Sequence, residues 1–151
     1  MMRHGAQDLA QRGQIGAAHL EAMIVAGLAL VLLRHGRHDE ALRELEVAWR
    51  MADVLGQVGA LSALHALSLP CAVIAKDRGA WSEHEARLSA RVNDEAVLEL
   101  EVIQAIEHAG HLCAQSNDMD RARRAWTLAA RFYANAGHAE RAATLRAKAT
   151  D

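Results

Sequence analysis

Histidine is the residue whose number and spacing first suggest chemistry in this chain. The sequence has nine histidines, and two pairs of them stand three residues apart, His35 with His38 and His108 with His111. On a continuous helix that spacing puts both rings on one face. A closed zinc site needs three or four ligands, however, and Glu107 points about 100° away from His108 on the same helix. The sequence therefore predicts no metal site, and the histidines are interpreted as surface or groove residues.

No nucleophile stands beside a recognisable base. Cys71 and Cys113 lie in apolar stretches with no paired spacing, which is typical of buried, reduced thiols rather than of a disulfide framework. No glycine-rich phosphate loop follows a strand pattern, because the sequence contains no strand pattern. We therefore expect no catalytic residue, no cofactor and no enzyme activity. The reduced thiols favour a cytoplasmic location.

Charge is unevenly distributed, although the formal net charge is only -2. Residues 94–107 hold five acidic side chains and no lysine or arginine, whereas residues 121–148 hold seven basic side chains against Glu140 alone. Three interpretations stay open: two solvated faces that partly neutralise each other, an acidic groove wall that selects a basic ligand, and nucleic-acid binding by the basic end. No aromatic platform accompanies the basic residues, so nucleic acid is not the expected partner.

The elements that must hold these residues are all predicted to be helices. Hydrophobic residues make up 52% of the chain, aromatic residues only 3%, and the single proline is Pro70, which is a composition of helix formers. Pro70 is expected to kink its helix, and Ser82 and Glu85 have the spacing of a capping box at a helix start. The expected helices are Ala6–Arg12, Ala17–His35, Asp39–Leu55, Val58–Lys76, Trp81–Arg91, Asn93–Gln115, Asn117–Ala136 and Ala139–Ala149.

A turn residue followed five positions later by a residue of the next helix recurs four times along the chain. The pairs are Gly36 with Ala41, Gly79 with His84, Asn117 with Ala122, and Gly137 with Ala142. A small residue about one turn into a helix lets two backbones approach closely. Segments 13–17 and 56–60 are near copies of each other and begin 43 residues apart. Gly36 and Gly79 are also separated by 43 residues, whereas Gly79 and Asn117 are separated by 38. The residues expected to be buried at helix crossings are Ala29, Ala41, Ala72, Gly110, Ala122 and Ala129.

This pattern resembles the tetratricopeptide-repeat family, in particular its long-period bacterial type. The residues that match are Ile106, Ala109, Gly110, Cys113, Ala122 and Trp126 in the third unit and Val25, Leu28, Ala29, Leu32, Ala41 and Leu45 in the first. In the second unit His84 stands where the family has a small residue. The resemblance implies an all-α fold, a right-handed α-solenoid of about three antiparallel helical hairpins plus a C-terminal capping helix. Its parts within the single domain 1–151 are an N-terminal extension at 1–16, hairpins at 17–55, 56–92 and 93–136, and the capping helix at 138–150.

The resemblance also implies a binding function. In such solenoids the first helix of each hairpin lines a concave groove that binds a peptide or protein segment. On this mapping the ligand groove consists of Met23, Leu30, Leu33, Arg34, Leu69, Val73, Gln104, Glu107, His108 and His111. We accordingly expect a non-enzymatic protein–protein interaction scaffold. The alternatives are a sensory or regulatory module of a bacterial regulator or signalling system that recognises a small molecule, and nucleic-acid binding by the basic C-terminal helices.

Self-association is a further expectation. Residues 22–33 are apolar around the whole helix, and the segment before them is short and polar, so part of this surface lacks a cover within the chain. We expect either a homodimer or a groove partly filled by the N-terminal segment. The same run is too short to cross a bilayer, so we expect no membrane partner.

Overall fold

The structure, a computed structural model, describes residues 24–25, 27–55 and 58–151. This part of the chain is helical apart from short connections and contains no strand, which confirms the predicted all-α class. Residues 27–34 are helical, and the further described helices are α2 (His38–Leu55), α3 (Val58–Ile74), α4 (Arg78–Asn93), α5 (Leu100–Gln115), α6 (Met119–Asn135) and α7 (Ala139–Thr150). The predicted extension 1–16, the predicted helix Ala6–Arg12 and the beginning of Ala17–His35 lie outside the described residues.

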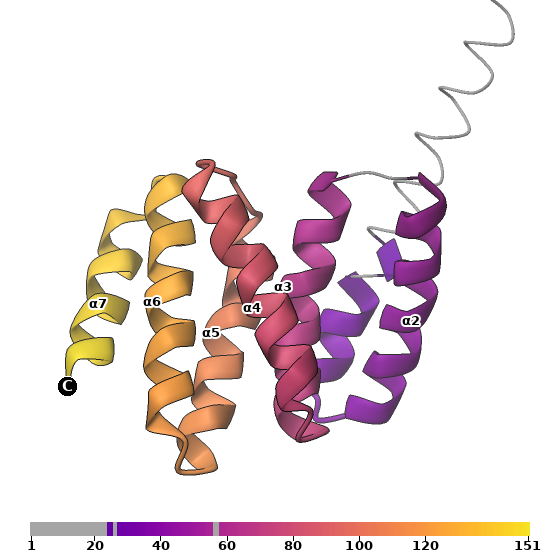
Figure 1. The fold of residues 1–151 in the computed structure, drawn as a ribbon, viewed down its shortest axis with the longest axis horizontal. Helices are drawn as coiled ribbons and strands as arrows, with labels where there is room; N and C mark the ends of the chain where they lie inside the picture. The colour runs from indigo at the N-terminus through magenta and orange to yellow at the C-terminus, as the bar shows by residue number, and fades with distance from the viewer. Residues whose placement is uncertain (1–23, 26, 56–57) are drawn as a thin grey trace, which may run out of the picture.

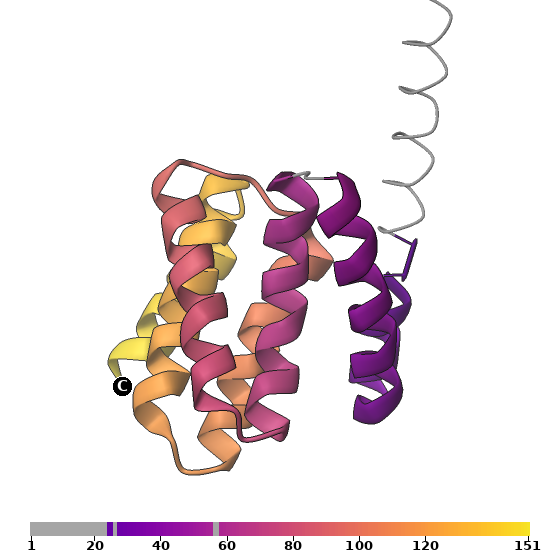
Figure 2. The ribbon, with the colours of Figure 1, turned by 45° about the vertical axis from the view of Figure 1, so that its right-hand side comes forward.

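The helices are arranged from residues 27–34 and α2 at one end of the molecule to α7 at the other (Figure 1), and helices adjacent in sequence pack against each other except α4 and α5. Figure 2 shows the same order in a view turned by 45°. α3 packs against α2, α4 and α5, and α6 packs against α4, α5 and α7. α3 and α6 therefore each connect three neighbours. None of the described helices combines the length and the apolar content that a bilayer-spanning segment requires.

The four short turns between successive helices share one backbone arrangement, which also occurs at Glu95 in the longer connection between α4 and α5, where the amide of Ala96 donates to the carbonyl of Arg91 at 3.1 Å. A residue with positive φ ends the first helix, and the next residue donates its backbone amide to a carbonyl oxygen five positions back at 2.8 to 3.0 Å. The left-handed residues are Gly36 (φ 73°), Lys76 (56°), Asn117 (61°) and Gly137 (86°). The hydrogen bonds satisfy carbonyl groups that the last turn of a helix otherwise leaves without a partner.

The register of the second turn differs from the sequence prediction. Gly79 is predicted to be the turn residue, but it lies inside α4, and Lys76 holds the left-handed conformation instead. Five positions after Lys76 comes Trp81, which is buried, rather than His84, which is half-buried. His84 does not match the small residue of the repeat family because the sequence prediction places the turn residue three positions too late, at Gly79 instead of Lys76.

An aspartate identifies the correct register. Asp77 is the N-cap of α4, and its carboxylate accepts a hydrogen bond from the backbone amide of Ala80 at 3.0 Å. The turn residue must therefore precede Asp77. Lys76 is 40 residues after Gly36 and 41 before Asn117, so the turns are spaced more evenly than the predicted 43 and 38.

The predicted capping box at Ser82 and Glu85 is wrong for the same reason. Because α4 already begins at Arg78, both residues lie within the helix. The carboxylate of Glu85 instead accepts a hydrogen bond from the indole Nε1 of Trp81 at 2.8 Å. Glu85 therefore fixes the orientation of a buried tryptophan rather than the start of a helix.

α5 begins later than predicted. The sequence predicts that Asn93 and Asp94 open this helix, but Asn93 is the last residue of α4 and Asp94 is its C-cap. Glu95 then adopts a left-handed conformation with φ 61°, and α5 starts only at Leu100. Asparagine and aspartate favour turns as well as helix starts, so this pair alone does not distinguish an end from a beginning.

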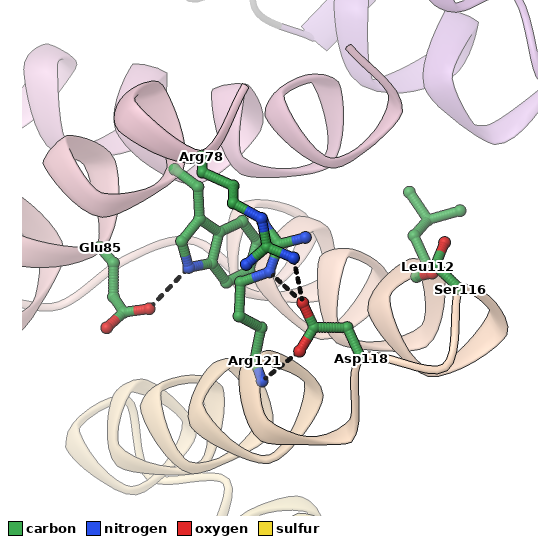
Figure 3. Close-up of polar contacts among 7 residues, drawn as sticks. Arg78, Glu85, Leu112, Ser116, Asp118 and Arg121 are labelled. Carbon is green, nitrogen blue, oxygen red and sulfur yellow. Dashed lines mark hydrogen bonds and ion pairs between the residues drawn. The ribbon is translucent and has the colours of Figure 1, made fainter. Parts of the chain in front are cut away.

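α6 begins where predicted, directly after Asn117 and Asp118. The carboxylate of Asp118 accepts hydrogen bonds from the backbone amide of Arg121 at 3.2 Å and from its Nε at 2.6 Å, and Arg78 Nη2 lies 3.6 Å away (Figure 3). The hydrogen bond from the Arg121 side chain is the main reason why the pKa of Asp118 is lowered. The Arg121 guanidinium also lies 5.2 Å from the ring centre of Trp81, so this helix start connects α6 to α4.

Small residues lie buried where helices cross. Burial is confirmed for all six predicted crossing residues, namely Ala29, Ala41, Ala72, Gly110, Ala122 and Ala129. At Gly110 the ring of Trp126 occupies the space that a β carbon would need, so α5 and α6 approach closely only because this residue is glycine. One core cluster includes residues from α3 to α7, and a second joins Ala29, Leu30, Leu32 and Leu33 to residues of α2 and α3 and to Ala105 of α5, so α3 contributes to both.

We expect Ala122→Leu to lower the free energy of unfolding by about 1–3 kcal/mol, because Ala122 is fully buried one turn into α6 and a larger side chain overpacks the crossing. Urea denaturation followed by circular dichroism measures the change. Ala143→Leu on the exposed side of α7 is the matched control, for which we expect a change below about 0.5 kcal/mol. Equal stability of the two variants would contradict a close crossing at Ala122.

Candidate functional site

A pocket of about 330 Å³ lies between residues 30–34 and α5. The buried part of its lining is apolar and the more exposed part is polar, and we call these the floor and the rim. The floor consists of Leu30, Leu33, Pro70 and Ala105, and the rim consists of Arg34, Gln104, Glu107, His108 and His111. Pro70 is the contribution of α3, and that helix continues past it to Ile74.

Seven of the ten groove residues predicted from the sequence line this pocket. Leu69 and Val73 do not, because both are buried in the core cluster that joins α3 to α7. Val73 lines a different pocket beside Asp118 and Arg121. Met23 lies outside the described residues. A ligand in the pocket therefore contacts Pro70 of α3 rather than Leu69.

α5 positions most of the rim. Gln104, Glu107, His108 and His111 follow the spacing i, i+3, i+4, i+7, which places them on one face of the helix. The remaining faces bury apolar residues in the core, which fixes the rotation of α5 about its axis. The packing of α5 therefore turns its polar face toward the pocket.

The rim is connected across the pocket by a hydrogen bond. Arg34 Nη2 donates to Gln104 Oε1 at 2.6 Å, and the two residues are 70 positions apart in sequence. Both side chains are at least partly exposed, so the bond adds little stability. A ligand with its own donors and acceptors can replace it without leaving a buried group unsatisfied.

Glu107 already has protein partners. Its Oε1 accepts a hydrogen bond from the hydroxyl of Tyr133 at 2.9 Å, and its Oε2 lies 3.5 Å from Nε2 of His111. Burial of the phenol, followed by its hydrogen bond to Glu107, raises the pKa of Tyr133 to about 12. Sequence reasoning missed Tyr133, and its one available signal is the spacing of seven residues from Trp126, which puts both aromatic rings on the same face of α6.

The predicted acidic wall is not part of this pocket. Of the five acidic residues in 94–107, Glu107 alone lines it, and the other four are exposed elsewhere. The positive groups around the rim are Arg34 and, beyond His111, Lys148, whose Nζ lies 3.3 Å from His111 Nδ1. The charges that surround the rim therefore do not favour a basic ligand over an acidic one.

His108 holds an unsatisfied polar atom at the pocket. Its Nε2 is buried and has no hydrogen-bond partner among the described residues. Burial is the first cause that lowers the pKa of His108, and His111, His38 and Arg34 lower it further, so the ring is neutral at pH 7. An unsatisfied buried nitrogen costs about 1–3 kcal/mol. Because this nitrogen has no accessible surface, a ligand in the pocket reaches it only if the His108 ring moves.

A second hollow of about 450 Å³ adjoins the first on the α7 side. The two share Gln104 and Glu107 in their linings, and the second is completed by Tyr133 of α6 and by Glu140, Arg141, Thr144 and Leu145 of α7. The polar face of α5 therefore lines both hollows, which together extend from residues 30–34 to α7. Such a surface is long enough for a segment of chain rather than a single side chain.

Three of the four arginines of α6, which belong to the basic stretch 121–148, already have partners. The pairs are Arg121 with Asp118, Arg124 with Glu85, and Arg131 with Asn93. A phosphate group would have to compete with these partners for the guanidinium groups, which reduces the gain from each contact.

The described residues offer little for metal or nucleophilic chemistry. Within this part of the chain, no three His, Cys, Asp or Glu side chains are close enough together to hold a metal ion. Burial raises the pKa of Cys71 to about 11 and also raises the pKa of Cys113. Both thiols therefore stay protonated at neutral pH, and a protonated thiol is a poor nucleophile.

A second polar cluster, which sequence reasoning did not bring together, lies between α2, α3 and α4. The Nδ1 atoms of His65 and His84 are 2.9 Å apart, and the ring centre of Trp49 lies 4.8 Å from that of His65. The Trp49 indole donates to the hydroxyl of Ser68 at 3.1 Å. Burial, followed by His84 and Arg87, lowers the pKa of His65 to about 4, and burial also lowers the pKa of His84.

These shifts predict a loss of stability in mild acid. Because the folded state holds His65 neutral down to about pH 4 whereas an unfolded histidine titrates near 6.5, the stabilisation is complete above pH 6.5 and declines toward pH 4. We expect the decline to be on the order of 1 kcal/mol, since the ring is only partly buried. Urea denaturation between pH 7 and pH 4 measures it. His65→Gln should flatten the profile, the exposed control His35→Gln should not, and identical slopes for both would contradict the assignment.

No family model, curated protein or solved structure matches the chain. The resemblance to tetratricopeptide repeats thus rests on the residues quoted from the sequence and stays a prediction.

Proposed function

We propose that this chain is a non-enzymatic binding module, a tetratricopeptide-like α-solenoid that holds a peptide or protein segment against the first helix of each hairpin, namely residues 27–34, α3 and α5. The even spacing of the left-handed residues supports the repeat, with 40 residues from Gly36 to Lys76 and 41 from Lys76 to Asn117. The packing of α3 on α5 and of α4 on α6 supports stacked hairpins, because like helices of successive units lie together.

The observation that carries the proposal is the pocket between residues 30–34 and α5. Its lining comes from three helices and combines an apolar floor with a polar rim, which is the usual composition of a recognition site. Burial of an apolar ligand group on Leu30, Pro70 and Ala105 supplies most of the binding free energy. The rim then fixes the orientation of the ligand through a few hydrogen bonds.

A peptide accounts for the length of the surface. The second hollow continues the first along the polar face of α5 and ends at α7, where Arg141 and Thr144 add polar groups. An extended segment can place one apolar side chain on the floor and its backbone along Gln104 and Glu107.

A regulatory small molecule is the second candidate. The volume of about 330 Å³ falls in the range of small-molecule sites. The imidazole groups of His108 and His111 in its lining can form directional hydrogen bonds with such a ligand. A compact ligand would use the first pocket alone, whereas a peptide would also require the hollow beside α7.

A peptide selected from a random phage-displayed library against the full chain tests this function. Gln104→Trp fills the boundary between the two hollows, and Arg34→Ala removes a rim donor, so we expect both to weaken binding at least about tenfold, equivalent to 1.4 kcal/mol. Titration calorimetry with the synthetic peptide measures the dissociation constant. Arg123→Ala, which changes the hollow between α4 and α6, is the matched control and should leave binding unchanged.

The opposite pattern would replace the groove by another surface. Suppose that Arg123→Ala weakens binding, that the two groove variants leave the dissociation constant unchanged, and that affinity falls steeply with salt. The binding surface is then the arginine-containing face of α4 and α6. If no peptide is selected but small-molecule fragments shift the nuclear magnetic resonance signals of His108, the regulatory module is the better assignment.

A further inference from the structure

The helix at the start of the described chain leaves a row of large apolar side chains exposed. Ile24, Leu28 and Val31 retain 64%, 46% and 48% of their accessible surface. Gly27, Leu28 and Val31 stand three, four and seven positions after Ile24, which is the sequence spacing of one helix face, and we call these four residues the N-terminal stripe. Together with α2, this helix forms the end of the molecule opposite to α7 (Figure 2).

The same helix face is covered in the two later units. The exposed residues stand twelve, eight and five positions before the turn residue Gly36. The residues at these positions before Lys76 are Leu64, Ser68 and Cys71, and those before Asn117 are Ala105, Ala109 and Leu112. The first five of these six are buried, and Leu112 is half-buried. The N-terminal stripe therefore corresponds to a surface that this fold packs against another helix wherever a neighbour is present.

The contacts in the second unit show what such a cover consists of. Leu64 and Cys71 belong to one core cluster with Ala29, Leu30, Leu32 and Leu33 and with Ala41, Leu45 and Ala48 of α2. The face of α3 in the second unit is therefore covered by the apolar surface of neighbouring helices. The N-terminal stripe would require a cover of the same kind.

Among the described residues, the stripe is itself the surface that best meets this requirement. The remaining exposed large apolar side chains, Leu42, Ile74, Val97 and Met119, stand singly on different elements. At the other end of the molecule, α7 is described in full and exposes no large apolar residue, and its outer side carries charged residues such as Arg146. Head-to-tail contact would therefore place apolar residues on a charged surface, whereas a two-fold axis places stripe against stripe.

Gly27 gives an independent indication of a close approach. Glycine inside a helix is less favourable than alanine by about 1 kcal/mol, and a close helix crossing that excludes a β carbon offsets this cost. At Gly110 that contact is the Trp126 ring. At Gly27 no described atom lies within 4 Å of the place that a β carbon would take, so no described residue occupies the space that the absent side chain leaves free. A helix of a second copy that crosses at Gly27 would occupy this space.

We propose that the N-terminal stripe binds the same stripe of a second copy of this chain, so that the protein forms a two-fold symmetric dimer. This interface is separate from the groove and leaves the polar face of α5 open. Its three large side chains are far fewer than the 20–30 residues on each side of a standard interface. We therefore expect a dissociation constant in the micromolar range.

Sedimentation equilibrium of the full chain, over about 10 to 500 μM, tests the dimer. We expect Leu28→Glu to weaken dimerisation at least tenfold, because it places a charge at the centre of the stripe. Gly27→Leu should do the same by blocking the approach of the partner helix, while its melting temperature stays equal or rises because leucine favours the helix. Met119→Glu is the matched control, since it changes an equally exposed apolar residue at the start of α6.

Three results would overturn the proposal. The first is a wild-type chain that remains a monomer throughout the concentration range. The second is a dimer that withstands both Leu28→Glu and Gly27→Leu. The third is a monomer whose melting temperature falls with Leu28→Glu but not with Met119→Glu, because the stripe would then be covered by another part of the same chain.

Discussion

The turn that joins successive helices is the constraint on which the rest of this structure depends. At each of four turns one residue in the left-handed conformation reverses the chain, and the following amide bonds back to the preceding helix at 2.8 to 3.0 Å. This geometry fixes how far one helix is rotated relative to the next. It therefore decides which residue of the second helix meets the first, and that residue is buried at Ala41, Trp81, Ala122 and Ala142.

The same constraint explains which features of the fold the sequence reveals. Glycine favours the left-handed region, so the turns at Gly36 and Gly137 are predictable from residue type alone. At Lys76 the conformation is imposed on an ordinary residue by its surroundings, and the nearby Gly79 gives a false signal. The informative residue there is Asp77, because an aspartate caps a helix start directly after the turn residue, as Asp118 does after Asn117.

Local sequence pattern alone predicts the part of the candidate site that lies on one helix, whereas the repeat resemblance is needed to put Leu30, Leu33 and Arg34 in the same groove. Helical periodicity brings Gln104, His108 and His111 to one face of α5, and the sequence shows this directly. The hydrogen bond between Arg34 and Gln104 depends instead on how residues 27–34 and α5 lean toward each other across α3, which no local pattern encodes. The burial of Leu69 follows from the same geometry, because α5 covers the side of α3 on which that leucine lies.

The position of α3 between two core clusters also explains why the polar rim of the pocket comes from the helices beside α3 and not from α3 itself. Between Val58 and Ile74 the chain has no aspartate, glutamate, lysine or arginine, as expected for a helix that packs against α2, α4 and α5. Such a helix has no charged group to offer a ligand, and its contribution to the pocket is the ring of Pro70. Polar recognition must therefore come from the flanking helices, which contribute Arg34 on one side and His108 on the other. The apolar sequence that makes α3 a central packing element is thus also what makes the middle of the pocket apolar and its edges polar.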